Sequence, residues 1–362
     1  MTPKEGRLDR RNFLGVAGTG ALLCTVGGTR FEVRDASDVK QVDEAAAAVN
    51  RPRRAARRGR GRDPVDNLSF PTPEPQPGGR RKEYWIEARP ATWNIAPRGR
   101  DEWMGKPVPR KRTFTAFLYQ QYTAGFAERV GTARMPGPTL NAEVGDVIVV
   151  HFRNGGGKKF NQAVTMHPHG VRYTPDYDGS YYGDFTRVGG FVKPGEEFTY
   201  TWEATPDSVG VWPYHDHGPN HTLNAFRGLF GTIIIRPRGE TPPDVETVLW
   251  LHSFPPQITG FDQLVHCVNG RTFAGNTPNV RARVGQKVAM HVIGGDSNFH
   301  TFHIHGHRWK NAAGANVDGP IFGPNEVITA AFTENNPGRW LYHCHVFTHQ
   351  DAGMAGWYLV QP

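Results

Sequence analysis

The sequence predicts an all-β protein in which an N-terminal signal and a disordered linker precede two tandem β domains. Three observations support this prediction. The turn residues Gly (43) and Pro (29) are abundant among 362 residues, short β-branched runs recur, and the sequence contains an internal repeat. This balance fits strands joined by many turns, and no long segment shows the apolar periodicity of a helix.

Short β-branched runs begin after about residue 83, where the sequence becomes strand-like. Examples are Val147–Phe152 and Gly231–Ile235, each bounded by turn residues. Runs of this length and composition are typical of buried strands.

An internal repeat divides this part of the chain into two homologous domains. Four blocks recur in the same order with similar spacing: 143–147 with 283–288, 166–170 with 302–306, 212–217 with 340–345, and 228–231 with 353–356. Such self-similarity is typical of a duplicated structural unit. Because Pro237, Pro242 and Pro243 lie in a turn-rich stretch between the copies, the predicted domains are 83–238 and 239–362.

The first 82 residues have a different character. Residues 1–30 have the layout of an export signal, with Arg10 and Arg11 ahead of a weakly apolar stretch from Gly15 to Val26. They resemble a twin-arginine signal, which predicts a periplasmic, cell-envelope or extracellular location; the alternative is a chance Arg-Arg pair in a disordered start. Residues 31–82, rich in Ala, Arg, Pro and Gly, predict a disordered basic linker.

The formal net charge of +8 lies almost entirely in this tail. Residues 1–82 hold 17 Lys and Arg against 10 Asp and Glu, which leaves the rest of the chain nearly neutral. A nucleic-acid-binding protein would carry its basic patch on the folded domain. No apolar run approaches the roughly 20 residues of a membrane-spanning helix. We therefore expect neither a nucleic-acid partner nor an integral membrane segment.

The chain has three cysteines, an odd number that argues against a disulfide framework. Cys24 would leave with the signal, and Cys267 is expected to be a buried small residue. Cys344 lies between two histidines and is a candidate metal ligand.

Each repeat contains two His-x-His pairs. Alternate side chains of a strand point to the same face, so both imidazoles of a pair project together. A lone histidine is usually structural, but four pairs at matching places predict one metal cluster between the domains. Zinc is disfavoured, because structural zinc sites favour four ligands that include thiolates. The pairs are His167 with His169, His215 with His217, His303 with His305, and His343 with His345.

The second repeat adds a thiolate and a thioether. His300, Cys344, His349 and Met354 supply the two imidazoles, one thiolate and weak axial thioether that define a blue-copper electron-transfer site. Because consecutive side chains in a strand point to opposite faces, Cys344 is expected to face the blue copper while its two neighbours face the cluster.

The first repeat lacks three of these four ligands. Asp216, Leu229 and Val164 stand where the second repeat has its cysteine, its methionine and its first histidine, and only His221 persists, opposite His349. The first domain is therefore expected to contribute to the cluster without holding a blue copper.

These motifs resemble the four copper motifs of the multicopper oxidases: His-x-His-Gly, His-x-His, His-x-x-His-x-His-Gly-His and His-Cys-His-x-x-x-His-x-x-x-x-Met. The match covers about 83–362, and two domains with the blue site in the second resemble the small two-domain laccases. The resemblance implies cupredoxin-like Greek-key barrels and four coppers per active unit: one type 1, one type 2 and two type 3. It also implies a homotrimer, with the cluster between the first domain of one subunit and the second domain of the next.

The resemblance also assigns the cluster ligands. The type 2 copper takes His167 and His303, one type 3 copper takes His169, His215 and His345, and the other takes His217, His305 and His343.

Reduction of dioxygen to water consumes protons, and carboxylates near the cluster are natural donors. Asp178 lies where small laccases carry an acid near the oxygen path, and Asp318 occupies a similar place in the second domain. Both also read as turn residues, since each is followed by Gly. Tyr173, four residues after His169, could donate an electron or simply pack.

The predicted function is that of a laccase, which takes single electrons from phenols or aromatic amines and reduces dioxygen to water. The alternative is an oxidase of cuprous or ferrous ions, for which Asp351 is a candidate ligand; the chain's six Met form no methionine-rich segment. A copper nitrite reductase would carry its blue site in the first domain, and a copper carrier would leave the four His-x-His pairs unexplained.

Overall fold

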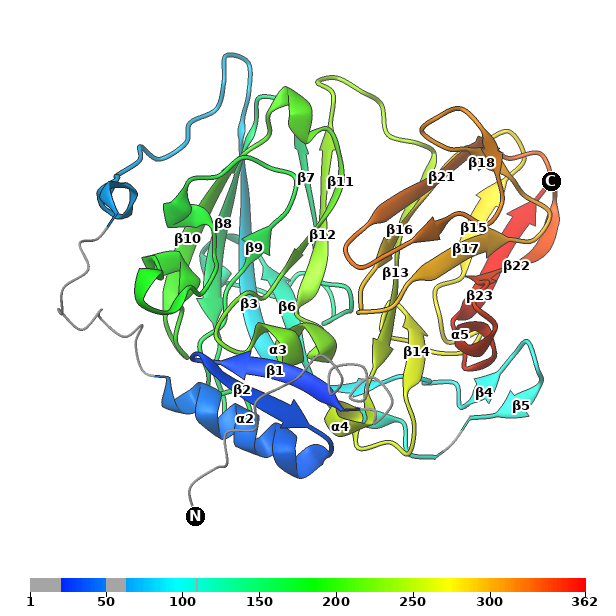
Figure 1. Ribbon diagram of the computed structural model, residues 1–362. Helices are drawn as coiled ribbons and strands as arrows, with labels where there is room; N and C mark the ends of the chain where they lie inside the picture. The colour runs from blue at the N-terminus through cyan, green and yellow to red at the C-terminus, as the bar shows by residue number, and fades with distance from the viewer. Residues whose placement is uncertain (1–20, 50–62, 109) are drawn as a thin grey trace.

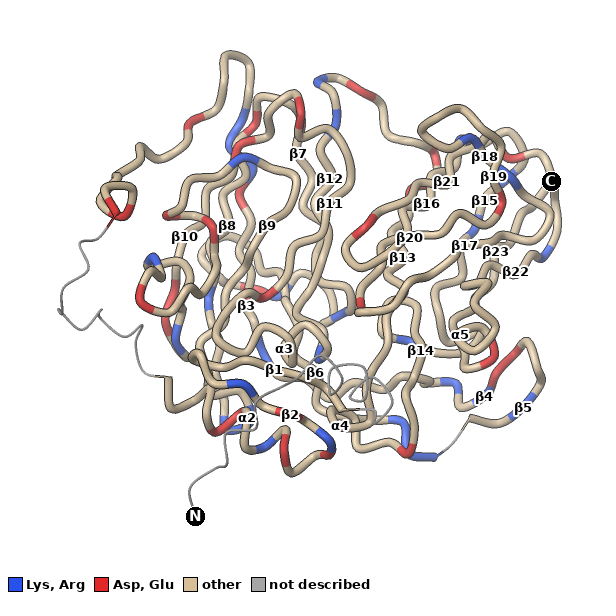
Figure 2. The backbone as a smooth tube through the Cα atoms, in the orientation of Figure 1, with Lys and Arg blue, Asp and Glu red and all other residues tan. Residues whose placement is uncertain are grey.

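The computed structural model describes residues 21–49, 63–108 and 110–362. The described chain forms two cupredoxin-like β domains side by side, with a small N-terminal unit packed beneath the first (Figure 1). The predicted fold class is confirmed. Figure 2 shows Lys and Arg interspersed with Asp and Glu along both domains.

The first domain is a sandwich of two four-stranded sheets. Their strand orders are β10-β8-β3-β6 and β7-β12-β11-β9. One helix, α3 (His221–Arg227), closes its lower end. The strands are β3 (Arg81–Asn94), β6 (Thr113–Tyr122), β7 (Thr139–Glu143), β8 (Val147–Asn154), β9 (His167–Pro168), β10 (Glu197–Glu203), β11 (Gly210–His215) and β12 (Phe230–Arg236).

The second domain repeats this plan with sheets ordered β14-β13-β16-β21 and β15-β23-β22-β17-β20. Two short helices, α4 (Pro256–Thr259) and α5 (Phe347–Asp351), flank them. The strands are β13 (Val245–Phe254), β14 (Val265–Val268), β15 (Val280–Arg283), β16 (Lys287–Gly294), β17 (His300–Ile304), β18 (Trp309–Lys310), β19 (Asn316–Val317), β20 (Ile321–Phe322), β21 (Val327–Thr333), β22 (Gly338–Cys344) and β23 (Ala355–Gln361).

The strand register agrees with the sequence repeat. In the first domain His215 of β11 pairs with His167 of β9. In the second domain His343 of β22 pairs with His303 of β17 at the equivalent place. The parallel pairs β3–β8 and β7–β12 likewise match β13–β16 and β15–β23. The two domains therefore hold their histidines on equivalent strands.

Each domain has its own hydrophobic core, and a third core joins them. In the joining core Phe230 of β12 stacks on Trp250 of β13 with ring centroids 4.4 Å apart. The indole of Trp250 also donates a hydrogen bond to Thr232 Oγ1 at 2.9 Å. These contacts fix the two domains against each other.

Residues 21–49 correct the predicted N-terminal organisation. They form the hairpin β1 (Leu22–Val26) and β2 (Thr29–Val33) and the helix α2 (Ala36–Ala48). The predicted signal boundary at residue 30 falls inside this hairpin, while Arg10 and Arg11 lie outside the described residues. The predicted disorder is wrong for 31–49, because Asp35 caps α2 and its alanine-rich sequence favours a helix.

This N-terminal unit is attached to α3 by apolar and charged contacts. Val39, Val42 and Ala46 are buried in a small core with Leu223 of α3. The buried Arg227 guanidinium makes two hydrogen bonds to the Asp43 carboxylate, at 2.7 and 2.6 Å. Residues 63–80 are also placed against the first domain, as the hydrogen bond from Gln76 N to Gly145 O at 3.0 Å illustrates.

An arm, residues 95–108 and 110–112, leaves the first domain between β3 and β6 and lies along the second. It carries the short strands β4 (Arg100–Asp101) and β5 (Lys106–Pro107) beneath the second domain (Figure 1). Glu102 N donates to Ala274 O at 3.0 Å, and the indole of Trp357 donates to Glu102 Oε2 at 3.0 Å. The arm therefore ties the two domains together from outside their cores.

No helix in the described part of the chain combines the length and apolar character needed to cross a bilayer.

Candidate metal centres

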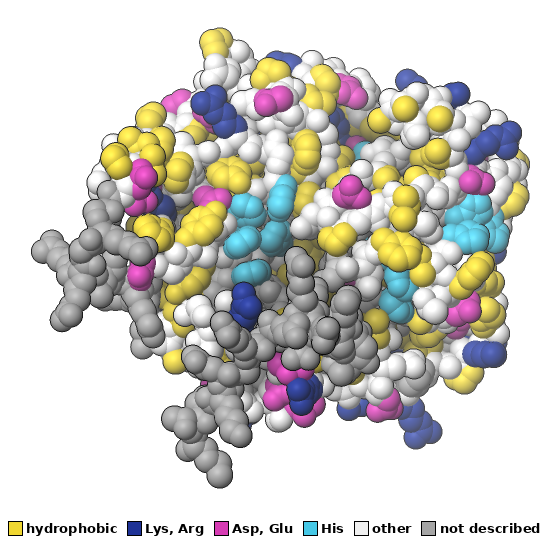
Figure 3. Space-filling view, in the orientation of Figure 1, with side chains coloured by type: hydrophobic (Ala, Val, Ile, Leu, Met, Phe, Trp, Pro, Cys, Tyr) yellow, Lys and Arg dark blue, Asp and Glu magenta, His cyan; other side chains and the backbone are white. Residues whose placement is uncertain are grey.

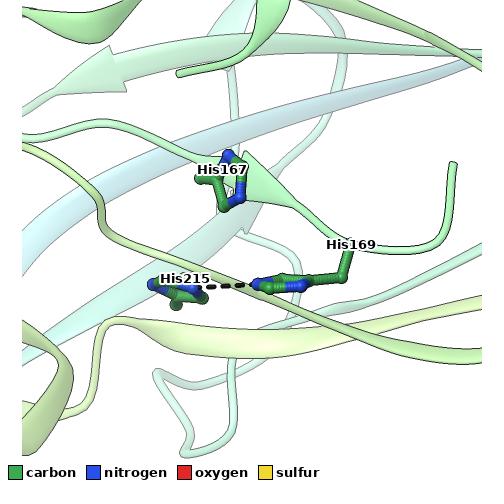
Figure 4. Close-up of side chains that lie close together, drawn as sticks. All are labelled: His167, His169 and His215. Atoms are coloured by element: carbon green, nitrogen blue, oxygen red, sulfur yellow. Dashed lines mark hydrogen bonds between the residues drawn. The ribbon is translucent and has the colours of Figure 1, made fainter. Parts of the chain in front are cut away.

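The first histidine group lies at the end of the β9–β11 pair. His167, His169 and His215 each offer one ring nitrogen, and these atoms lie within 4.8 Å of one another. His169 Nε2 and His215 Nε2 are 3.0 Å apart, and the His167 ring lies across them (Figure 4). His217 is adjacent, with its ring centroid 5.1 Å from that of His167.

The second domain builds a matching group on β17 and β22. His303, His305 and His343 offer ring nitrogens within 4.8 Å of one another. His305 Nε2 and His343 Nε2 are 3.2 Å apart, which repeats the spacing of the first group. His345 lies beside them, with its ring centroid 5.2 Å from that of His343. The structure thus brings each domain's four predicted cluster histidines together.

Backbone carbonyls fix the tautomer of the central histidines. His167 Nδ1 lies 2.7 Å from Asp178 O, and His303 Nδ1 lies 2.6 Å from Asp318 O. His215 and His343 make the same kind of bond to the carbonyl of the following residue. A ring nitrogen that donates to a carbonyl carries the proton. In each of these rings, Nε2 therefore keeps a free electron pair that can bind a metal.

Burial lowers the pKa of three of the grouped histidines. Desolvation, reinforced by neighbouring histidines, lowers the pKa of His169 to about 4. The same burial lowers the pKa of His215 to about 3 and that of His343 to about 4. Because a histidine binds metal only in its neutral form, these three rings are in the ligand state at pH 7.

The two groups are separate within one chain. Among the described residues, the groups able to hold a metal contain histidines of one domain only. Figure 3 likewise shows histidine side chains gathered at separate places over the two domains. His305 and His345 are exposed, so the second group faces outward. Each domain therefore presents half of a cluster.

The third group is the predicted blue site. Cys344 Sγ lies 3.8 Å from His300 Nδ1 and 3.7 Å from His349 Nδ1. Met354 is fully buried in the core that contains Cys344. Its backbone carbonyl accepts a hydrogen bond from Cys344 N at 3.1 Å, and its N–H donates to His349 O at 3.0 Å. Three of the four predicted ligands thus meet inside the second domain, and the fourth, Met354, is held to two of them through its backbone.

The donor set of this third group fits a copper ion. Burial alone would raise the pKa of the Cys344 thiol, but hydrogen bonds from His300 and His349 lower it to about 6. The sulfur is therefore largely thiolate at neutral pH, which is the form that binds a metal. Two imidazoles and one thiolate suit copper better than a hard cation.

In the first domain the equivalent position holds a carboxylate. Asp216 is fully buried and its Oδ1 accepts hydrogen bonds from Thr165 N at 2.7 Å and Gly218 N at 3.2 Å. Its Oδ2 accepts one from the Asn224 side chain at 2.8 Å. The carboxylate that replaces the thiolate of the second domain is thus satisfied by hydrogen bonds.

The three candidate auxiliary residues differ in their placement. Asp178 is buried beside the first group, with Oδ1 3.3 Å from His167 Nδ1. Tyr173 packs edge-on against His167 with ring centroids 5.8 Å apart, and burial next to Asp178 raises the pKa of its hydroxyl to about 12. The Asp318 side chain is exposed, and its carbonyl rather than its carboxylate contacts His303.

Three residues near the candidate ligands escaped the sequence analysis, two at the blue site and one at the second histidine group. The buried Asp296 carboxylate lies 3.2 Å from His300 Nε2 through Oδ1. The ring of His266 stacks on His349 with centroids 4.2 Å apart. At the second histidine group, Trp103 of the arm stacks on His343 with ring centroids 6.5 Å apart. Asp296 precedes His300 by four residues in a loop of turn-forming sequence, the one local signal that could have indicated it.

Comparison with known proteins agrees with this geometry. Family models described as multicopper oxidase match residues 130–240 and 240–362. A solved structure described as a multicopper oxidase is 25% identical, covers 80% of this chain and 92% of its own, and superposes with a TM-score of 0.62. A blue copper oxidase from Nitrosomonas europaea, 21% identical over 78% of this chain and 86% of its own, shares the fold with a TM-score of 0.58.

Curated relatives are larger proteins. The ferroxidase HEPHL1 of Mus musculus is 28% identical in an alignment of 351 positions that covers 78% of this chain and 29% of the relative. A probable nitrite reductase-hydroxylamine oxidoreductase fusion protein of Kuenenia stuttgartiensis is 28% identical in an alignment of 259 positions that covers 66% of this chain and 29% of the relative. The chain therefore spans less than a third of the length of these relatives.

Proposed function

Because the chain belongs to the multicopper oxidases, we propose that it is a laccase-type enzyme. Four molecules of a phenol or aromatic amine each lose one electron, and one dioxygen takes four electrons and four protons to give two water molecules. The observation that carries this proposal is the complete donor set: one thiolate-centred group and two matching histidine groups on a single chain.

The residues present fit copper at each proposed site. His300, Cys344, His349 and Met354 would hold the type 1 ion, and the eight cluster histidines would hold one type 2 and two type 3 ions. Bound copper would supply one-electron redox chemistry and a place for dioxygen. The chain's part is to present imidazoles with free Nε2 atoms and a buried thiolate.

A cluster shared between subunits is supported by the way the histidines divide. His169 and His215 pair in the first domain, and the third member of their assigned set, His345, belongs to the second. The pair His305 and His343 in turn lacks His217. A head-to-tail ring of three chains would complete both sets at each interface, because a heterologous contact closes when its rotation divides the circle.

Co-expression of two inactive variants tests this sharing. His169→Ala damages only the first-domain half, and His305→Ala only the second-domain half. Each variant alone should fail to consume dioxygen, whereas a mixed ring contains interfaces with both halves intact and should regain uptake. Mixed oligomers, separated by differing tags, that stay inactive would show that no cluster is built between subunits.

An organic donor is favoured over a metal ion, although ferroxidases are among the relatives. The chain's six methionines form no cluster that would collect cuprous ions. Asp351, the candidate ligand for a donor metal ion, is the exposed last residue of α5. Oxygen uptake by the copper-loaded protein should be faster with a methoxyphenol than with ferrous or cuprous ions. The reverse order would identify a metal oxidase.

Asp178 and Tyr173 are proposed to serve the cluster. Asp178 Oδ1 lies 3.3 Å from His167 Nδ1, so this carboxylate can accept a proton and pass it on at the edge of the cluster, and Tyr173 hydrogen-bonds the same carboxylate. Export by the twin-arginine route is proposed from Arg10 and Arg11 alone.

A further inference from the structure

The proposed electron donor faces a physical obstacle, because the blue-site ligands are buried. His300, Cys344 and Met354 have no exposed surface, and His349 is 8% exposed. A bulky organic molecule therefore has almost no direct access to a ligand atom. It needs a binding place on the protein that lies against the segment bearing the ligands.

One cavity meets this requirement. It has a volume of about 290 Å³ and lies between the arm and the second domain. Large apolar side chains, Phe261, Leu264 and Phe273, line it on the second-domain side. The arm contributes Ile95, Val108 and Lys111 to the opposite side.

The wall of this cavity is part of the blue-site loop. Ala352, a lining residue, is two residues before Met354, so their Cα atoms are at most about 7.6 Å apart. The other wall is hydrogen-bonded to the same loop: Phe273 N donates to Gly353 O at 2.8 Å, and Thr272 Oγ1 donates to Ala352 O at 3.2 Å.

A second connection runs through β14. The lining residue Val265 immediately precedes His266, whose ring stacks on His349 with centroids 4.2 Å apart. Ser253 Oγ lies 2.8 Å from His266 Nδ1 and holds this ring in place. The cavity therefore touches segments that lead to two of the four predicted blue-site ligands.

We propose that this cavity is the electron-donor site and that it takes a small, uncharged, mostly apolar aromatic molecule such as a methoxyphenol. The inference rests on the proposed laccase function. The bound donor gives one electron to the blue site and releases its phenolic proton to solvent, which leaves a neutral phenoxyl radical.

The lining chemistry favours this occupant over a metal ion. Asp262 is the single carboxylate among the lining residues, whereas a hard cation requires several oxygen ligands. The ammonium of Lys111 donates to Gly260 O, so it is already engaged with the backbone. Apolar walls with few polar groups are typical of sites for small organic ligands.

Two substitutions on opposite walls test the proposal. Leu264→Asn removes apolar surface at the mouth, where Leu264 is 39% exposed. Val108→Trp fills the cavity from the arm. Each should raise the KM for the methoxyphenol about ten-fold, which corresponds to a loss of roughly 1.4 kcal/mol of apolar contact. The visible thiolate absorption and the rate with hexacyanoferrate(II), which needs no organic pocket, should stay within about two-fold of the parent.

Val284→Asn is the matched control, because Val284 is 45% exposed in the turn between β15 and β16 and lines no part of this cavity. Its KM should be unchanged. An unchanged KM in both cavity variants would overturn the donor site while leaving the laccase function intact. A parent protein that consumes dioxygen only with ferrous or cuprous ions would instead remove the function on which the site rests.

Discussion

The two domains share one fold and differ in the residue at one buried position, which lies near the end of equivalent strands. In the second, Cys344 and two imidazoles converge in the core. In the first, Asp216 occupies the same place and is held by backbone N–H groups and Asn224. Both copies keep the outward-facing histidines. At the buried position, the second domain holds the predicted blue-site cysteine, whereas the first holds a carboxylate that is fixed by hydrogen bonds.

The contrast shows that the barrel alone does not make an electron-transfer site. Both copies have the same strand register at β9–β11 and β17–β22. What differs is whether the buried position carries a group that needs a metal or one that hydrogen bonds can satisfy. The following predictions alter that position or its surroundings.

The largest effect is expected from the cysteine. Cys344→Ser should abolish the intense visible absorption and the oxidation of organic donors, because an alcohol is not a thiolate donor. The copper content of the cluster should persist, as measured by metal analysis. Cys267→Ser is the control: Cys267 is also fully buried but belongs to none of the three metal groups. Retention of the visible band by the Cys344 variant would contradict the assignment.

The structural counterpart should affect stability instead. Asp216→Ala leaves two backbone N–H groups and the Asn224 amide unpaired in a dry core, so the free energy of unfolding should fall by about 3 kcal/mol. Asp216→Asn, which keeps the shape, should lose less. Denaturant unfolding measures both, and the visible band of either folded variant should match the parent. A weakened band would mean that Asp216 also influences the blue site.

A smaller effect is expected from Asp296, which accepts from His300 Nε2 in a nearly dry environment. Asp296→Asn removes its negative charge, so the reduction potential of the blue site should rise and its copper affinity should fall about ten-fold. Redox titration of the visible band and competition with a copper chelator measure these changes.

A second buried carboxylate–histidine pair in the same domain provides the control for this experiment. Glu334 is buried against His307, with Oε1 3.1 Å from Nε2, and His307 belongs to none of the metal groups. Glu334→Gln should therefore lower stability without moving the potential. If the reduction potential of the blue site shifts equally in both variants, the effect of Asp296 comes from buried charge in general and not from its contact with His300.

The sequence was informative where the signal is local and periodic. His-x-His spacing reports which face of a strand a ligand takes, so His167 with His169 and His343 with His345 could be predicted. The stacking of His266 on His349 joins β14 to α5, and no local pattern reports such a contact. The position of the arm could not be predicted either, because its turn-rich sequence does not indicate which part of the chain it packs against. The α2 helix was missed although Asp35 and Asp38 form a capping box.

The alternation along β22 has a further consequence for how this protein can diversify. Since neighbouring side chains of a strand face opposite ways, inserting or deleting one residue within β22 would turn both His343 and Cys344 to the wrong side. The strand therefore tolerates substitution but not change in length. The arm and the loop around Leu264 have no such restriction, so new substrate preferences can arise there by insertion or deletion while the metal-bearing strand is inherited unchanged.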